Sequence, residues 1–149
     1  MAQNMQSVDG IIKTLEEWFA KAPALPKGGR DFIVNVAPWA SLVVGVFFLV
    51  IGGFGLLGGA FLSPFAAVGG GVGFAANLLL AAVVVIVEGV IYLLAFKPLQ
   101  ARQMRGWKLL FWNELLMILH AVISLDWLGV IISFLLGFYF LFQIKSYYK

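Results

Sequence analysis

The feature that most constrains this chain is a long stretch without charge. From Phe32 to Val87, 56 consecutive residues include no Asp, Glu, Lys, Arg or His. One soluble core could hardly bury such a segment, whereas two membrane-spanning helices of about 20 residues each account for it. The whole chain agrees, since 62% of its residues are hydrophobic, 11% are charged and its mean hydropathy is +1.00. We therefore expect an integral membrane protein.

Four transmembrane helices are expected. Pro38 suits a first helical turn, where its missing N–H is no loss, so the first span is predicted at 38–62, ended by Ser63-Pro64. Glycine is a poor helix former, so the glycines at 69–71 predict a turn before a second span at 73–96. Two apolar stretches then predict spans at 109–125 and 127–144, joined by a tight turn. The predicted fold class is an all-α integral membrane protein, a four-transmembrane-helix bundle.

The positive charges predict the orientation of this bundle. All ten Lys and Arg residues lie before the first span, between the second and third, or after the fourth. Because short basic loops stay in the cytoplasm, both termini and the middle loop are expected there. A bacterial inner membrane is the expected location. Anionic lipid headgroups, rather than nucleic acid, are the expected partners of the basic middle loop. Its basic residues are Lys97, Arg102, Arg105 and Lys108.

Residues 1–31 form the only segment suited to water. Apolar residues recur there at helical spacing and charged residues occupy the other faces, which predicts an N-terminal amphipathic helix followed by a linker. Two roles stay open for it: an anchor that lies in the headgroup region, or a docking helix for a partner protein. The apolar face consists of Val8, Ile11, Ile12, Leu15, Trp18, Phe19 and Ala22.

Small residues form stripes along the predicted spans. Hydrophobic drive between helices is weak in lipid, so close backbone approach through small residues becomes a main source of contact. We expect these stripes to pack the bundle, with oligomerisation or a hinge in the first span as alternatives. The residues expected at helix contacts are Gly45, Gly52, Gly55, Gly59, Gly73, Gly129, Ser133 and Gly137.

Polar residues inside the predicted spans are the candidates for function. Asn77 and Glu88 share one face of the second span, and a second polar stripe follows the third span, in which Glu114 lies at a depth similar to that of Glu88. A charge in the bilayer centre costs about 2.5 to 3.5 kcal/mol, so neither acid should face lipid while ionised. The candidate proton or cation site consists of Glu88, Glu114, His120, Asn77 and Asn113.

Two interpretations of this site stay open. A protonated Glu88 that bonds to Asn113 or His120 would hold helices together, and the chain would be a non-enzymatic membrane scaffold or subunit, which is our first expectation. Alternatively, Glu88 and Glu114 share a proton or bind a cation, because two close carboxylates do not easily both ionise, and His120 extends the relay. The chain would then be a small proton-coupled or cation transporter, expected to be oligomeric.

No catalytic or cofactor site is expected. The chain has no cysteine and one histidine, which excludes disulfides and thiolate sites and disfavours zinc. Glycine patterns that start at Gly53 and Gly71 fit the dinucleotide fingerprint, but neither follows a predicted strand. Ser124, His120 and Asp126 are residue types that hydrolases use, yet Asp126 is expected to be a turn residue that caps the fourth span.

In size and number of spans, the chain resembles the small multidrug transporters of the four-helix type. In that family the essential membrane-embedded glutamate lies in the first helix. Here the first span has no acid and Glu88 lies in the second. The resemblance covers the general plan only, and we assign no family.

Overall fold

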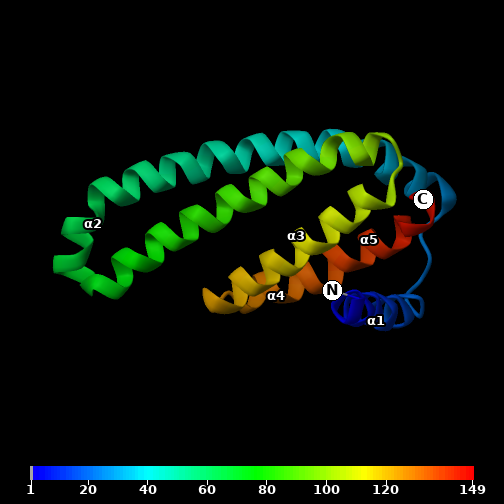
Figure 1. Ribbon diagram of the computed structural model, residues 1–149, viewed down its shortest axis with the longest axis horizontal. Coiled ribbons are helices and arrows are strands. Elements are labelled where there is room, and N and C mark those ends of the chain that lie inside the picture. The colour runs from blue at the N-terminus through cyan, green and yellow to red at the C-terminus, as the bar shows by residue number, and fades with distance from the viewer. Residues whose placement is uncertain (1) are drawn as a thin grey trace.

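All regular secondary structure in the part that the structure describes is helical (Figure 1). The structure is a computed structural model that describes residues 2–149, except for the side chains of residues 2–9, 63, 66, 67, 70–72, 74 and 75. The α-helices are α1 (Ala2–Phe19), α2 (Lys27–Gln100), α3 (Met104–Ile123), α4 (Trp127–Ile132) and α5 (Phe138–Ile144). A π-helical turn, Ser133–Gly137, joins α4 to α5, and a 3-10 turn, Lys145–Tyr147, follows α5.

Four helical segments are long and apolar enough to cross a membrane, as the sequence predicts: Lys27–Leu62, Ala76–Gln100, Met104–Ile123 and Trp127–Tyr147. The first two belong to α2, which bends back on itself (Figure 1). We call Lys27–Leu62 the first arm of α2 and Ala76–Gln100 the second arm.

The observed bounds of the first arm differ from the predicted ones. The helix begins at Lys27 rather than near Pro38, and helical structure continues past Pro64. A proline inside a helix removes one backbone hydrogen bond, which can bend the helix without ending it. The Ser41 hydroxyl donates a 2.7 Å hydrogen bond to the Pro38 carbonyl, one turn away. Pro38 is therefore an interior residue of a longer helix.

Close backbone contact holds the two arms together. Gly45, Gly52 and Gly59 recur every seven residues on the first arm, and all three face the second arm. A Cβ built on Gly52 would lie 2.6 Å from Ile86 Cγ1 and 3.1 Å from Ile86 N. A Cβ on Gly45 or on Gly89 would lie 3.0 Å from the other glycine's carbonyl oxygen. Side chains at these positions would push the arms apart, so the glycines permit this approach.

The tightest core lies at one end of the bundle. Trp107 and Phe111 of α3 are almost completely buried there with Phe138 of α5, and the Trp107 indole donates a 2.8 Å hydrogen bond to the Leu141 carbonyl. The α2–α3 connection, α1 and the C-terminus are at the same end (Figure 1). All ten Lys and Arg residues lie in or next to these segments, or in the α1–α2 linker and the first turn of α2, so we call it the basic end. The opposite end, with the α2 bend and the α3–α4 turn, is the distal end.

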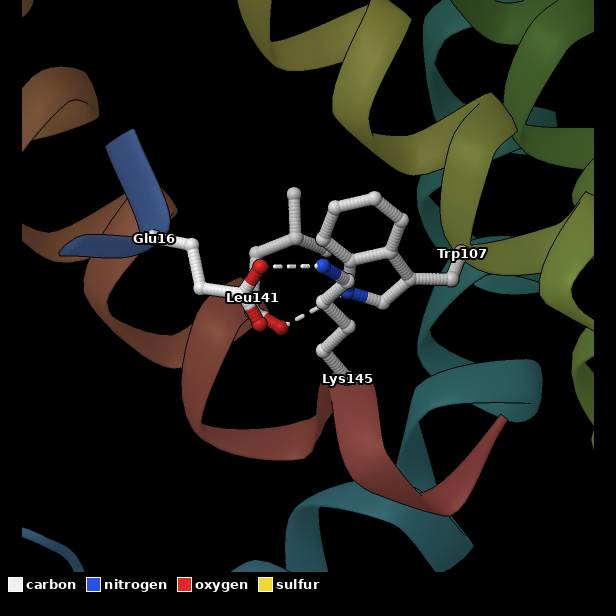
Figure 2. A network of polar contacts seen from close by, with 4 residues as sticks. All are labelled: Glu16, Trp107, Leu141 and Lys145. Atoms are coloured by element: carbon white, nitrogen blue, oxygen red, sulfur yellow. Dashed lines mark hydrogen bonds and ion pairs between the residues drawn. The ribbon is translucent and has the colours of Figure 1, made fainter. Parts of the chain in front are cut away.

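Helix α1 packs against α5 at the basic end (Figure 1). Figure 2 shows the polar part of this contact: Lys145 Nζ lies 2.5 Å from Glu16 Oε2 and 5.5 Å from the centre of the Trp107 ring. The Phe19 ring contacts three aromatic rings of the π-helical turn and α5, which belong to Phe134, Phe138 and Phe142.

The apolar residues of α1 divide between two directions. Ile12 belongs to the buried core cluster and Leu15 and Phe19 pack against it, whereas the Ile11 and Trp18 side chains are 51% and 60% exposed. The side chain of Val8, which we placed on the same face, lies outside the described ones. The amphipathic character of this N-terminal segment and its contact with lipid stay predictions.

The two short connections reverse the chain through left-handed residues. Arg102 (φ 54°) turns the chain between α2 and α3, and Leu125 (φ 57°) turns it between α3 and α4. Asp126 Oδ1 then accepts a 2.9 Å hydrogen bond from the Gly129 N–H at the start of α4. The expected capping role of Asp126 is confirmed.

Neighbouring glycines test the contact between the arms. Gly52→Ala should destabilise the protein by about 1 to 3 kcal/mol, because its Cβ would collide with Ile86. Gly53→Ala should be neutral or stabilising by up to about 1 kcal/mol, because no described atom lies within 4 Å of a Cβ added at Gly53 and alanine favours a helix. Thermal unfolding in detergent would measure both. Equal effects of the two changes would show that the arms do not meet at Gly52.

Candidate functional site

Glu88 is the most deeply placed acid of the described chain. It occupies the centre of the second arm, Ala76–Gln100, about 18 Å from either end at 1.5 Å per residue. Its side chain is only 3% exposed, and its Oε1 accepts no hydrogen bond from any described residue. The nearest basic group is His120, whose Nδ1 lies 3.9 Å from Oε1. That distance permits an ion pair but is too long for a direct hydrogen bond.

The glycine contact between the arms determines where Glu88 points. Gly89 lies against the first arm, in contact with the Gly45 carbonyl. Successive residues of a helix point about 100° apart. Glu88 is therefore turned away from the first arm, and its carboxylate meets His120 of α3.

The polar faces of the second arm and α3 meet along their length. One turn from Glu88, the Tyr92 hydroxyl lies 3.6 Å from Met117 Sδ. It also interacts with the side chain of Asn113, which is 1% exposed. Unpaired buried polar atoms are rare in proteins, so the buried Oε1 of Glu88, which has no hydrogen-bond partner among the described residues, is unusual.

A cavity of about 330 Å³ adjoins Glu88. It lies between both arms of α2, α3, α4 and the π-helical turn, and we call it the distal cavity. It runs from Glu88 to Asp126 in the α3–α4 turn, so it extends from the middle of the bundle to the distal end. Its other polar lining residues are His120, Ser124 and Ser133.

Glu114 occupies the middle of α3 and faces a different element. Its carboxylate lies against Gly137 and interacts with the Ser133 hydroxyl, so it meets both ends of the π-helical turn. Single π-turns inside α-helices occur often at functional sites. Glu114 is also near enough to interact electrostatically with Glu88. We place the two carboxylates in one site, although they project toward different neighbours.

Glu114 lines a second cavity of about 250 Å³. This cavity lies between both arms of α2, α3, the π-helical turn and α5, and we call it the basic-end cavity. Ser41 and Tyr92 are its other polar lining residues, and Ile33 and Ile144 lie at its basic-end limit.

The structure separates Asn77 from the other predicted site residues. Asn77 is exposed and lines a third cavity, of about 170 Å³, near the distal end. His120 and Ser124 line both this third cavity and the distal cavity. Glu88, Glu114, His120 and Asn113 lie closer together, around the middle of the bundle.

The glycines proposed for helix packing fall into three groups. Gly45, Gly52 and Gly59 contact the second arm closely, and a Cβ on Gly55 would meet Ala82 at an ordinary 3.4 Å. Gly129 leaves room for the Asp126 carboxylate, and Gly137 leaves room for the Glu114 carboxylate. Ser133 also contacts the Glu114 carboxylate. Gly73 has no described atom within 4 Å of an added Cβ.

Sequence reasoning did not assign Tyr92 and Ser133 to the site. Tyr92 was recognisable from its position, one turn from Glu88 on the same face. Ser133 was recognised as a small packing residue but not as a neighbour of Glu114. The π-helical turn that positions it has no simple sequence signal.

The basic residues of the middle loop lie at the basic end. Lys97, Arg105 and Lys108 are exposed, and Arg102 Nη2 donates a 2.8 Å hydrogen bond to Asn35 Oδ1 of the first arm. Three of the four are therefore free to meet headgroups.

Within the described residues, no group of three or more His, Asp or Glu side chains has the geometry of a metal site. Comparison of the chain with protein-family models, with curated proteins and with solved structures finds no match. The function must therefore be inferred from the geometry around Glu88, Glu114 and His120.

A double-mutant cycle tests the contact between Glu114 and Gly137. Gly137→Ala should destabilise the protein by about 1 to 2 kcal/mol, because the new Cβ would overlap the Glu114 carboxylate. In a Glu114→Ala background, the same change should be neutral or slightly stabilising, since the obstruction is gone. Thermal unfolding of the four proteins gives the coupling. Identical effects of Gly137→Ala in both backgrounds would contradict this contact.

Proposed function

We propose that the chain is a multi-pass membrane protein with both termini and the α2–α3 loop in the cytoplasm. Its four long apolar helices and the gathering of all basic residues at one end support this proposal. The exposed Lys97, Arg105 and Lys108 would then face anionic headgroups of the cytoplasmic leaflet.

Single introduced cysteines test this topology, and because the chain has no cysteine of its own, all thiol labelling reports the introduced residue. In intact cells or right-side-out vesicles, an impermeant thiol reagent should label Gly69→Cys in the α2 bend and leave Gln103→Cys unlabelled. Inside-out vesicles should give the reverse. Both positions are exposed in the structure. Labelling of both from the same side would rule out the four-span topology.

We further propose that this membrane protein is a proton-coupled or cation transporter in which Glu88 binds the transported ion. The observation that carries the proposal is the state of Glu88: central, 3% exposed, without a hydrogen bond to Oε1, and beside a cavity that extends to the distal end. An acid at such depth cannot face lipid while ionised, and ionisable groups inside membranes commonly mark ion pathways. A purely structural carboxyl would be expected to have its hydrogen bonds satisfied.

Near-isosteric replacement of Glu88 tests this function. Wild-type protein in proteoliposomes should dissipate an imposed pH gradient faster than protein-free liposomes when Na⁺, K⁺ or a tetraalkylammonium ion is supplied on the opposite side. Glu88→Gln should reduce the rate to the protein-free level, because the amide cannot exchange a proton. Glu17→Gln is the matched control, since Glu17 is an exposed glutamate of α1. Equal rates for wild type and Glu88→Gln, with both proteins folded by circular dichroism, would refute the transport role.

A membrane scaffold or subunit is the second candidate function. It is favoured by the tip of the α2 hairpin, which extends beyond the α3–α4 turn (Figure 1). The tip exposes large apolar side chains, among them Phe61, Phe65 and Val68, which are 76%, 70% and 91% exposed. A second copy or another membrane protein could cover them. Under this alternative, Glu88→Gln would be almost silent in every assay.

A further inference from the structure

The distal cavity and the basic-end cavity lie on opposite sides of a single level along the bundle axis. On every segment that lines both, the basic-end residues lie nearer the basic end, and no residue is shared. The residues on either side of the division are Tyr92 and Glu88 on the second arm, Glu114 and Met117 on α3, and Gly137 and Ser133 across the π-helical turn. Of the two glutamates in the middle of the bundle, Glu88 therefore lines the distal cavity and Glu114 lines the basic-end cavity.

Side chains of three elements separate the two cavities. The Tyr92 ring packs edge-to-face on Phe48, with ring centres 5.8 Å apart, and its hydroxyl contacts Met117 Sδ at 3.6 Å. Ser133 makes a polar contact between the two cavities. It lines the distal cavity, and its hydroxyl interacts with Glu114, which lines the basic-end cavity. The side chains of Phe48, Tyr92 and Met117 thus separate the cavities on one side of the bundle, and the Ser133 hydroxyl connects them on the other.

Each cavity leads toward a different end. The distal cavity reaches Asp126 in the α3–α4 turn, while the basic-end cavity reaches Ile33 and Ile144, the latter next to Lys145. In the proposed topology these ends face opposite sides of the membrane. The carboxylate of Glu88 is 3% exposed and borders the distal cavity, and its Oε1 has no hydrogen-bond partner among the described residues. A cavity of this size with several polar lining residues has room for water.

We infer that the two cavities are access routes of opposite sidedness, one leading from the distal side to Glu88 and the other from the cytoplasm to Glu114, and that the ion passed between them is a proton. This inference rests on the proposed transport function, since it specifies the path and the ion at the same site.

The crossing step is a proton transfer between the two carboxyl groups. The O–H bond of protonated Glu88 breaks, and the proton passes to the Ser133 hydroxyl oxygen, directly or through cavity water. Ser133 gives its own hydroxyl proton to the Glu114 carboxylate, because a hydroxyl can accept and donate at once. Glu88 is left ionised, Glu114 is left neutral and nothing is oxidised or reduced. His120 lies 3.9 Å from Glu88 and can stabilise the ionised state.

Cysteine accessibility tests the two routes. Thiols react as thiolates, which form in water and not in hydrocarbon. Ala121→Cys and Ser124→Cys in the distal cavity should be modified by a charged, impermeant thiosulfonate from the distal side only. Ala37→Cys and Ala40→Cys in the basic-end cavity should be modified from the cytoplasmic side only. Val122→Cys and Val36→Cys are the controls: both valines are 39% exposed and line neither cavity, so they should stay unmodified.

The labelling pattern decides the inference independently of transport. Modification of both cavities from the same side, or of cavity and control positions alike, would overturn it even if proton flux depended on Glu88. Sided labelling with no Glu88-dependent flux would instead retain the two routes and reject the transport function.

Variants of Ser133 test the crossing step. Ser133→Ala should slow the Glu88-dependent proton flux without changing the cysteine labelling, and Ser133→Thr, which restores a hydroxyl, should recover it. Ser146→Ala, at an exposed serine after α5, is the control and should leave the flux unchanged. Unchanged flux in a folded Ser133→Ala protein would remove Ser133 from the path.

Discussion

The contact between Gly45 and Gly89 is the constraint on which the centre of this structure depends. Because neither residue has a Cβ, the two arms of α2 approach until a backbone carbonyl of each lies where a side chain would begin. This approach fixes the rotation of the second arm about its own axis, and the adjoining Glu88 is thereby directed at α3. Larger residues at positions 45 and 89 would rotate or displace the second arm, and Glu88 would then face a different neighbour.

A second small residue has the corresponding effect on the other carboxylate. Gly137 makes room for Glu114 at the end of the π-helical turn, where Ser133 begins the same turn. The tightly packed aromatic core around Trp107 anchors α3 and α5 at the basic end. Farther from it, the same helices leave cavities on both sides of the carboxylates. The bundle is thus closely packed at the basic end and less closely packed where its acids lie.

Much of the fold was predictable because it follows from composition and period. The charge-free stretch from Phe32 to Val87 predicts two apolar helices, and the face that contains Glu88 is recognisable from helical spacing. The start of α2 at Lys27 was not predictable, because whether Pro38 begins a helix or bends one depends on what the helix packs against. The pairing of Glu114 with Ser133 also escaped prediction, since spacing assigns a residue to a face but not the rotation of one helix against another.

The structural alternative for Glu88 can be weighed against its surroundings. A carboxyl that served only to join helices would gain most from a complete set of hydrogen bonds, and the buried amide of Asn113 is a suitable partner on the next helix. The two do not pair. Each unsatisfied buried group costs about 1 to 3 kcal/mol, whereas an interhelical bond in a membrane contributes about 0.6 kcal/mol. An acid with an unsatisfied buried oxygen beside a cavity is poorly arranged to hold helices together and well arranged to take up and release a proton.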